Sequence, residues 1–358
     1  MKILFVDCSV DGHHIPYLKA LLSLYPDSVC VLPEPAEVGG KVVVYPEPEK
    51  YKSLVQHRKW LSFIRRTAER ENADTVHFLY GDKFFRFFGT GLSRFGRLRV
   101  LMTFHNLRYG LLYSVSVRRI FRRISAGVVH TDYLIKQLES MGISNAVHIE
   151  YPVFAPSEPC DTSALRDLYG IPRDRKVLLA LGGTRYDKGL DLLLAALKNV
   201  KEPFFLLIAG RPQAFDEAFI QRETESYGEN VRTVLRFLTA REPADFSALS
   251  DIAVLPYRRI FDGASGPLTE AVARGKAVVG PSHGSLGDLI SRNELGYTFE
   301  AENVPALTEV LRLALRENFV YGERAKNYAV SLGVDAFLQR YAALYDRLRL
   351  PAVKGNMV

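Results

Sequence analysis

Short, fully apolar runs alternate with longer amphipathic segments along this chain, a pattern typical of buried parallel strands covered by helices. In the first half the apolar runs occupy residues 3–7, 28–32, 42–45, 75–78, 99–104, 126–130 and 146–150. Helix-favouring segments between them occupy residues 15–25, 51–72 and 133–141. The alternation predicts an α/β fold with a parallel sheet in this half.

The same alternation restarts after a proline-rich stretch, residues 151–175, which holds Pro152, Pro156, Pro159 and Pro172. We place the connection between two domains there, since 358 residues exceed what one small core usually supports. Beyond it we expect strands at 177–181, 204–209, 231–237, 252–256 and 277–280, and helices at 189–198, 214–227, 243–250, 266–274 and 304–316. The predicted domains are 1–155 and 156–334, followed by a C-terminal segment, 335–358, whose amphipathic helix is a candidate for packing back on the first domain.

Composition argues for a folded protein, because 47% of residues are hydrophobic and 24% are charged. The apolar start, residues 1–6, is too short for the apolar region of a signal peptide. No run approaches the roughly 18 apolar residues that a spanning helix needs. The three cysteines, Cys8, Cys30 and Cys160, are odd in number and widely spaced. We therefore expect a cytoplasmic protein without a disulfide framework.

The net charge of +7 is concentrated in the first half of the chain. Residues 1–155 hold 21 Lys or Arg and 14 Asp or Glu, whereas residues 156–358 hold 26 of each class. The excess is sharpest in 83–131, with ten basic and no acidic residues. Arg118, Arg119, Arg122 and Arg123 recur at helical spacing, with Val117, Ile120, Phe121 and Ile124 between them. This pattern predicts an amphipathic helix at an anionic membrane, on the cytoplasmic face; a solvated basic face is the alternative.

The segment 180–191 combines a strand that ends in glycines, including Gly183, with two cations, Arg185 and Lys188, just before a helix. Glycines let backbone N–H groups approach an anion, and a helix N-terminus adds partial positive charge. The pattern predicts a diphosphate site. A glycine-rich turn with solvated charges is the alternative for this segment alone.

A second segment carries two acids, Asp262 and Glu270, separated by seven residues. Between them lies a loop of small residues, Gly263, Ala264, Ser265 and Gly266. Pro267 suits the first turn of a helix, where its missing N–H costs nothing, and Gly275 suits the helix end. The loop amides are thus placed at a helix N-terminus, where they can meet an anion.

These two segments resemble the glycosyltransferases of family 4, also called glycosyl transferases group 1, which have the GT-B fold. The family pattern is Gly-Arg…Lys-Gly, then Glu-x7-Glu followed by Ala-x-Ala-x-Gly-x-Pro-Val, and this chain has Arg185, Lys188-Gly189, Asp262-x7-Glu270 and Ala271–Gly275. The resemblance implies two Rossmann-like domains whose parallel sheets face each other across a cleft. It also implies that Arg185 and Lys188 bind the donor diphosphate, Asp262 the sugar, the 263–266 loop the phosphates and Glu270 the ribose.

Two positions depart from the family pattern: Asp262 replaces the usual Glu, and Ala277 the usual Pro. The shorter Asp262 puts the family's grip on the sugar hydroxyls in question. In the first half, Asp11-Gly12-His13-His14 follows the first strand, and Gly12 is a candidate for the donor-phosphate side; a simple tight turn is the alternative. His105 ends a strand and resembles the family's sugar-contacting histidine, against a capping or core histidine.

The resemblance implies a retaining glycosyltransferase of the hexosyltransferase type, acting on a glycan or lipid-linked acceptor, with a role in cell-surface polysaccharide or glycolipid synthesis. No Asp-x-Asp motif occurs, so we expect metal independence, and no cofactor beyond the nucleotide-sugar substrate. An NDP-sugar epimerase of the same architecture would usually lack the Lys-Gly and acid-x7-acid motifs. A non-catalytic nucleotide- or membrane-binding scaffold is a second alternative. A nucleotide-dependent oxidoreductase is disfavoured because no G-x-G-x-x-G follows a predicted strand.

Overall fold

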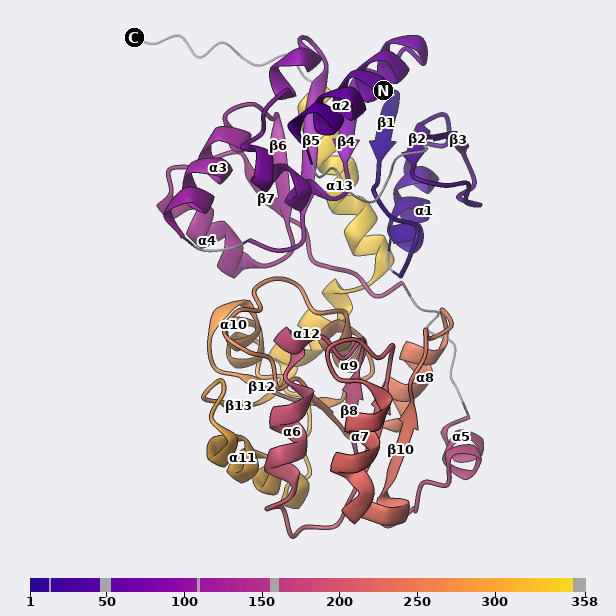
Figure 1. Ribbon diagram of the computed structural model, residues 1–358, viewed down its shortest axis with the longest axis vertical. Helices are drawn as coiled ribbons and strands as arrows, with labels where there is room; N and C mark the ends of the chain where they lie inside the picture. The colour runs from indigo at the N-terminus through magenta and orange to yellow at the C-terminus, as the bar shows by residue number, and fades with distance from the viewer. Residues whose placement is uncertain (13, 46–52, 108–109, 155–160, 350–358) are drawn as a thin grey trace. The chain divides into compact units, whose positions relative to one another are not determined.

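The computed structural model describes residues 1–12, 14–45, 53–107, 110–154 and 161–349 (Figure 1). Four residues that the sequence analysis names, His13, Pro156, Pro159 and Cys160, lie outside these residues, as does the predicted boundary at 155/156. The chain forms two compact units, Met1–Glu150 with Val334–Val358, and Tyr151–Gly333. Each is described by itself.

Unit 1 is built on a seven-stranded sheet in the order β3-β2-β1-β4-β5-β6-β7, with every neighbouring pair parallel. Its strands are β1 Ile3–Val6, β2 Val29–Leu32, β3 Lys41–Val44, β4 Thr75–Phe78, β5 Arg99–Phe104, β6 Ala126–Val129 and β7 Ala146–His148. Its helices are α1 His14–Leu24, α2 Leu54–Arg70, α3 Leu111–Phe121, α4 Asp132–Ser140 and α13 Val334–Arg349, with the 3₁₀ helices η1 Gly81–Phe87 and η2 Leu92–Phe95.

The last helix, α13, is held in unit 1 by a buried network of aromatic and polar side chains. The Tyr341 hydroxyl lies 2.5 Å from that of Tyr17 on α1 and 3.0 Å from that of Thr103 on β5. His77 on β4 contacts the Tyr345 hydroxyl through Nδ1, at 2.6 Å, and Thr103 through Nε2, at 3.0 Å. These hydrogen bonds satisfy polar groups that burial would otherwise penalise. The chain therefore leaves unit 1 after Glu150 and returns to it at Val334.

Unit 2 has a six-stranded parallel sheet in the order β10-β9-β8-β11-β12-β13. Its strands are β8 Lys176–Leu181, β9 Phe204–Ala209, β10 Val231–Val234, β11 Ile252–Val254, β12 Ala277–Pro281 and β13 Gly296–Phe299. Its helices are α5 Thr162–Tyr169, α6 Leu190–Leu197, α7 Glu217–Thr224, α8 Glu242–Leu249, α9 Gly266–Ala273, α10 Gly284–Arg292, α11 Val304–Arg316 and α12 Glu323–Ser331, with the 3₁₀ helices η3 Tyr186–Lys188 and η4 Glu225–Asn230.

The strand order of unit 2 reverses between β8 and β11, since the chain builds outward from β8 in one direction and then in the other. In open parallel sheets, ligands bind beyond the carboxyl ends of the strands at such a switch point. Both motif segments of unit 2 begin there, because 182–189 follows β8 and 255–266 follows β11.

The structure corrects one expectation about α3. Val117, Ile120, Phe121 and Ile124 were expected to face a membrane, but all four are buried in the core of unit 1. A helix that covers a sheet has an apolar face for the same reason as a helix at a lipid surface, and periodicity does not distinguish the two. Among the described residues, no helix has both the length and the apolar character needed to cross a membrane.

Candidate functional site

The loop after β8 is shaped around the side chain of Lys188. Gly182 has φ of +107°, and a Cβ added to it would lie 2.6 Å from Lys188 Nζ. Gly189 has φ of +64°, and an added Cβ would lie 2.1 Å from the Pro256 carbonyl oxygen. The positive φ favours glycine at both positions, and at Gly189 a side chain would also collide with the backbone just after β11.

Lys188 lies close to the loop that opens α9. Its Nζ is 5.3 Å from the ring centroid of Tyr257, whose hydroxyl is 3.3 Å from Ser265 Oγ. Ser265 is the N-cap of α9 and accepts a hydrogen bond from the Leu268 N–H. A small cavity of about 20 Å³ lies beneath the glycines, lined in part by Gly182, Lys188 and Tyr257. The structure thus gathers an ammonium group, glycine backbone and a capped helix N-terminus, an arrangement that suits an anion.

Arg185, the other predicted cation, is paired with a carboxylate that the sequence analysis did not single out. Its guanidinium donates to both carboxylate oxygens of Asp187, at 2.9 and 2.7 Å, and the side chain is half exposed. A bidentate pair of this kind fixes the orientation of the guanidinium. Arg185 therefore has to leave or share Asp187 in order to hold a diphosphate.

Asp262 is buried beside the N-terminus of α10. One carboxylate oxygen, Oδ1, accepts hydrogen bonds from the Ser285 hydroxyl, at 2.6 Å, and from the Ser285 backbone N–H, at 3.3 Å. Burial raises the pKa of Asp262, while the hydrogen bonds from Ser285 act in the opposite direction. The carboxylate is thus held at a fixed place, which is what a group that orients a ligand needs.

Glu270 lies on α9 and pairs with Arg274, one turn later on the same helix, at 2.7 Å. Both side chains are largely buried. Burial raises the pKa of Glu270, and the charge of Arg274 lowers it in part. Tyr151 lies nearby, since an added Cβ on Gly266 would come within 4.0 Å of its ring. The pKa of Tyr151 is raised by burial first and by the charge of Glu270 second.

The unit 1 candidates lie at the carboxyl ends of their own sheet. Gly12 has φ of +57° and opens the turn before α1. Nearby, His14 Nδ1 lies 2.8 Å from Asp7 Oδ1, so a buried carboxylate orients this imidazole. His105 is buried, with Nε2 3.0 Å from the Leu79 carbonyl oxygen and its ring stacked on Tyr80.

The loop that carries His105 is held by Asp82. Its two carboxylate oxygens accept hydrogen bonds from the backbone N–H groups of His105 and Asn106, both at 3.0 Å. The sequence analysis did not identify the hydrogen-bonding partners of the predicted site residues. These partners are Asp82, Asp187, Arg274 and Ser285. Arg274 lies four residues after Glu270 on one helix, a spacing that predicts contact. Asp187 lies two residues after Arg185, a spacing that does not predict contact on a helix, and Asp82 and Ser285 lie 23 residues away from their partners.

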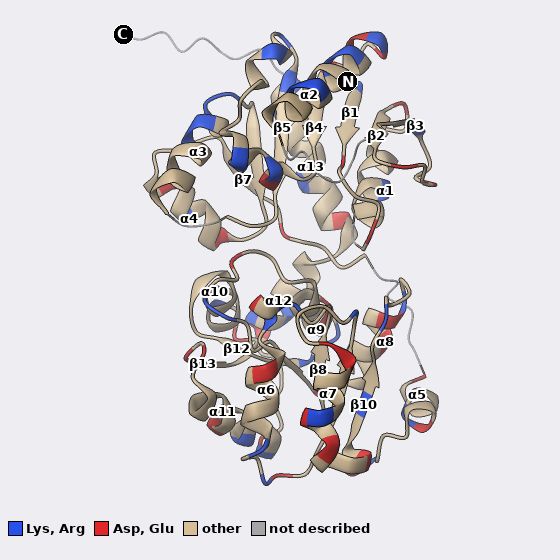
Figure 2. Cartoon of the chain, in the orientation of Figure 1, with Lys and Arg blue, Asp and Glu red and all other residues tan. Residues whose placement is uncertain are grey.

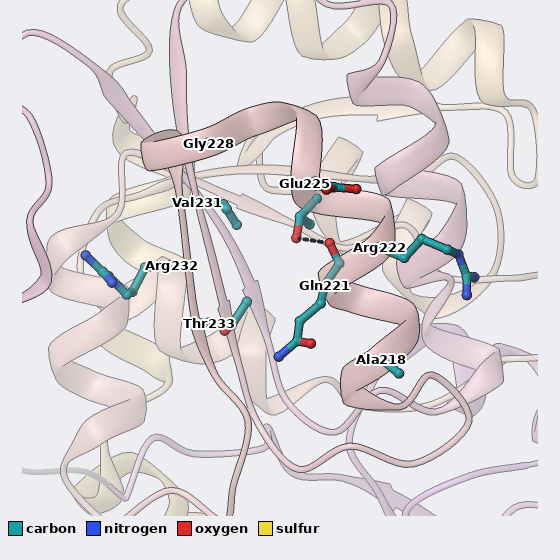
Figure 3. Close-up of a pocket in the computed structure, with 9 residues that line it drawn as sticks. Ala218, Gln221, Arg222, Glu225, Gly228, Val231, Arg232 and Thr233 are labelled. Carbon is teal, nitrogen blue, oxygen red and sulfur yellow. Dashed lines mark hydrogen bonds between the residues drawn. The ribbon is translucent and has the colours of Figure 1, made fainter.

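A separate groove of about 640 Å³ lies between α7, η4 and β10 (Figure 3). Its walls carry Gln221, Arg222, Glu225 and Arg232. It begins beside the first residues of β10, at the amino end of that strand, whereas parallel sheets place ligands at carboxyl ends. None of the predicted site residues lines it. Among the described residues, no cluster of three or more His, Cys, Asp or Glu side chains could hold a metal ion.

Comparison with known proteins adds to this geometry. Residues 161–330 match the model of the family described as glycosyl transferases group 1. A D-inositol 3-phosphate glycosyltransferase from Xylanimonas cellulosilytica is 26% identical over 186 residues, which are 50% of this chain and 43% of that relative. The chain therefore matches less than half of the length of this curated relative.

Two solved structures share the fold across almost the whole chain. HepE from Anabaena, in complex with UDP and glucose, superposes with a TM-score of 0.77 at 17% identity, covering 97% of this chain and 100% of that one. Sucrose-phosphate synthase from Thermosynechococcus elongatus gives a TM-score of 0.79 at 15% identity, covering 98% and 99%. The chain has the GT-B fold, and its residues 161–330 match the family described as glycosyl transferases group 1.

Proposed function

We propose that the protein transfers a sugar from a nucleoside-diphosphate sugar to an acceptor, with retention of anomeric configuration. The observation that carries the proposal is the packing of Lys188 against the glycine loop, close to the capped N-terminus of α9. A leaving diphosphate develops negative charge as the bond to the anomeric carbon breaks. Preorganised cations and backbone amides stabilise such charge without reorganising during the reaction.

Each predicted donor residue has a role in this chemistry. Lys188 and Arg185 neutralise the diphosphate, and the amides of the 263–266 loop bind its oxygens. Asp262 accepts hydrogen bonds from the sugar hydroxyls, and Glu270 from the ribose. The acceptor oxygen attacks from the face that the diphosphate leaves, and a phosphate oxygen takes the acceptor's proton. We propose no metal ion, because the two cations supply the positive charge.

The experiment is a thermal-shift panel of UDP, GDP, ADP and dTDP and their common sugar esters. Binding to the native state raises the apparent stability by RT ln(1 + [L]/Kd). One base should stand out, and the Anabaena structure, which contains UDP, makes UDP the first to test. Transfer of the sugar to an acceptor, with release of the nucleoside diphosphate, then separates a transferase from an epimerase, and any turnover excludes a scaffold. Binding of no nucleotide in the panel would contradict the proposal.

We further propose a glycan or lipid-linked acceptor and contact with an anionic membrane through α3. Leu111 and Leu112 are 83% and 72% exposed, and Val115 is exposed beside them. Basic residues follow in the sequence: Arg118 and Arg119 on the same helix, and Arg122 and Arg123 just beyond it. Figure 2 shows Lys and Arg positions in blue in the region of α3. Exposed apolar side chains next to clustered arginines suit acyl chains below anionic headgroups. This surface supports a role in cell-surface polysaccharide or glycolipid synthesis.

Liposome co-sedimentation tests this contact. Wild type should pellet with anionic vesicles at low salt and release at high salt, because salt screens the attraction. Changing Leu111 and Leu112 to Ser should weaken pelleting. Val320→Ser, at an 82% exposed apolar position of unit 2, is the matched control and should leave it unchanged. Equal pelleting of all three proteins would show that Leu111 and Leu112 are not the contact, and a wild type that does not pellet would point to a soluble acceptor instead.

A further inference from the structure

His283, in unit 2, makes no side-chain hydrogen bond with the described residues that would explain a histidine at this position. It follows β12 and is the N-cap residue of α10, but its side chain makes no capping hydrogen bond. Both of its ring nitrogens are buried, and neither has a hydrogen-bond partner among the residues that the structure describes. Burying a polar group without a partner costs free energy, so an apolar side chain would serve packing better.

The buried histidines of unit 1 show the contrast. His77 uses both ring nitrogens, one toward Tyr345 and one toward Thr103. His130 directs Nδ1 to the Ile149 carbonyl oxygen at 2.8 Å. These imidazoles belong to networks that hold the unit together, whereas that of His283 does not. An unsatisfied buried group in a native fold calls for an explanation such as a ligand.

The position of His283 identifies the kind of ligand. It lies in the loop beyond the carboxyl end of β12, two residues before Ser285, which holds Asp262. The imidazole is close enough to Asp262 to lower the pKa of that carboxyl, in opposition to burial. An ionised carboxylate only accepts hydrogen bonds, whereas a neutral imidazole has one donor and one acceptor nitrogen. Sugar hydroxyls donate and accept, so neighbouring hydroxyls satisfy both groups at once.

We propose that His283 is a donor-sugar-binding residue that acts beside Asp262 and helps to determine which sugar is accepted. This rests on the proposed function, because it assumes that a nucleotide sugar occupies the site. In this arrangement Ser285 fixes the short Asp262 carboxylate, and His283 supplies a second polar contact to the sugar. The bare nucleoside diphosphate does not reach His283.

The test is calorimetry on wild type, His283→Leu and His283→Gln, using the nucleoside diphosphate selected by the thermal-shift panel and its glucose and galactose esters. His283→Leu should weaken the preferred sugar ester about tenfold, the loss expected for one hydrogen bond, and leave the diphosphate within about twofold. His283→Leu should also reduce the difference in affinity between the glucose and galactose esters. His283→Gln retains a donor and an acceptor and should restore part of the loss. Ser282→Ala, at the exposed neighbouring position, is the matched control.

Thermal unfolding without ligand distinguishes binding from a structural role. His283→Leu should unfold at or above the wild-type temperature, since it removes buried unsatisfied nitrogens. A lower unfolding temperature with equal losses for the diphosphate and its esters would overturn the inference and leave the proposed function intact. If wild type binds neither the diphosphate nor its sugar esters, the proposed function and this inference fail together.

Discussion

The two units have the same parallel architecture, but the motif loops of unit 2 and the seat of α13 in unit 1 use polar groups of different kinds. In the motif loops, charged side chains pair with near neighbours, as Arg185 does with Asp187 and Glu270 with Arg274. Where α13 packs in unit 1, the polar groups are buried and are joined into a neutral network by His77 and the tyrosines of α13. A charged side chain can exchange its protein partner for a charged ligand, which suits a binding site. A buried neutral network whose hydrogen bonds are all made suits the attachment of a helix.

The pKa shifts show the same contrast. Burial lowers the pKa of His77 to about 3 and that of His130 to about 4. In unit 2, burial instead raises the pKa values of Asp262 and Glu270. The buried histidines of unit 1 therefore stay neutral to a lower pH than free histidines do. The buried carboxyl groups of unit 2 become protonated, and so lose their negative charge, at a higher pH than free carboxyl groups do. Each prediction below tests this difference, beginning with the largest expected effect.

Removing the ammonium group from the glycine loop should nearly abolish turnover. Lys188→Ala should lower kcat about 10²- to 10³-fold, or about 2.7 to 4 kcal/mol, the scale of losing one preorganised donor to a developing charge. Steady-state kinetics with the selected donor measures this. Lys198→Ala, on the same unit and paired with Glu223, is the control and should be nearly normal. A normal kcat/KM in Lys188→Ala would show that Lys188 does not stabilise the leaving diphosphate.

Acid should loosen unit 1 before unit 2. The ordinary pKa of histidine is about 6.5. As the pH falls from about 6.5 to about 5, His77 and His130 therefore bind protons in the unfolded chain but not in the folded protein. Stability is therefore lost as pH falls, by about 2 kcal/mol for His77 alone over this window. Protonation of Asp262 and Glu270 has the opposite sign and favours folded unit 2. Hydrogen exchange on the full chain, corrected for intrinsic rates, should show loss of protection in β4 and β6; equal loss in β11 and β12 would contradict the contrast.

The two motif acids should separate the sugar from the nucleotide. Asp262→Asn should weaken the nucleotide sugar about tenfold and the bare nucleoside diphosphate little, since Asp262 is assigned to the sugar. Glu270→Gln should weaken both ligands to a similar extent, because both contain the ribose. Calorimetry measures the four affinities. Identical patterns in the two variants would show that they do not divide the donor between them.

Loosening α13 should affect unit 1 alone. Tyr341→Phe removes a hydroxyl that lies within hydrogen-bond distance of both Tyr17 and Thr103, and should lower the free energy of unfolding by about 1 kcal/mol. Denaturant titration measures this change. Nucleoside diphosphate affinity should stay within about twofold of wild type, because the residues proposed to bind it, apart from Gly12, lie in unit 2. A large loss of affinity would show that the network also serves the donor site.

Much of the fold could be predicted from the sequence because it depends on local patterns. Continuous apolar runs located all seven strands of unit 1 and five of the six in unit 2, missing β13 Gly296–Phe299, where short, half-buried positions leave no clear run. The helices α5, α10 and α12 were also missed. Length does not explain this, because α6 to α9 have eight residues each and were predicted. The segment of α5 lies in the proline-rich stretch predicted as a connection.

The sequence by itself determined the glycines of the 182–189 loop, the spacing of Asp262 and Glu270 and the proline in the first turn of α9, since each is a property of neighbouring residues. Only the tertiary structure decided what these groups contact. It brought Ser285 to Asp262 across 23 positions and returned α13 to unit 1. It also placed the apolar face of α3 against the core of unit 1. Periodicity shows that a helix has an apolar face, but what covers that face, and which distant group satisfies a buried carboxylate, depend on packing between elements far apart in the chain.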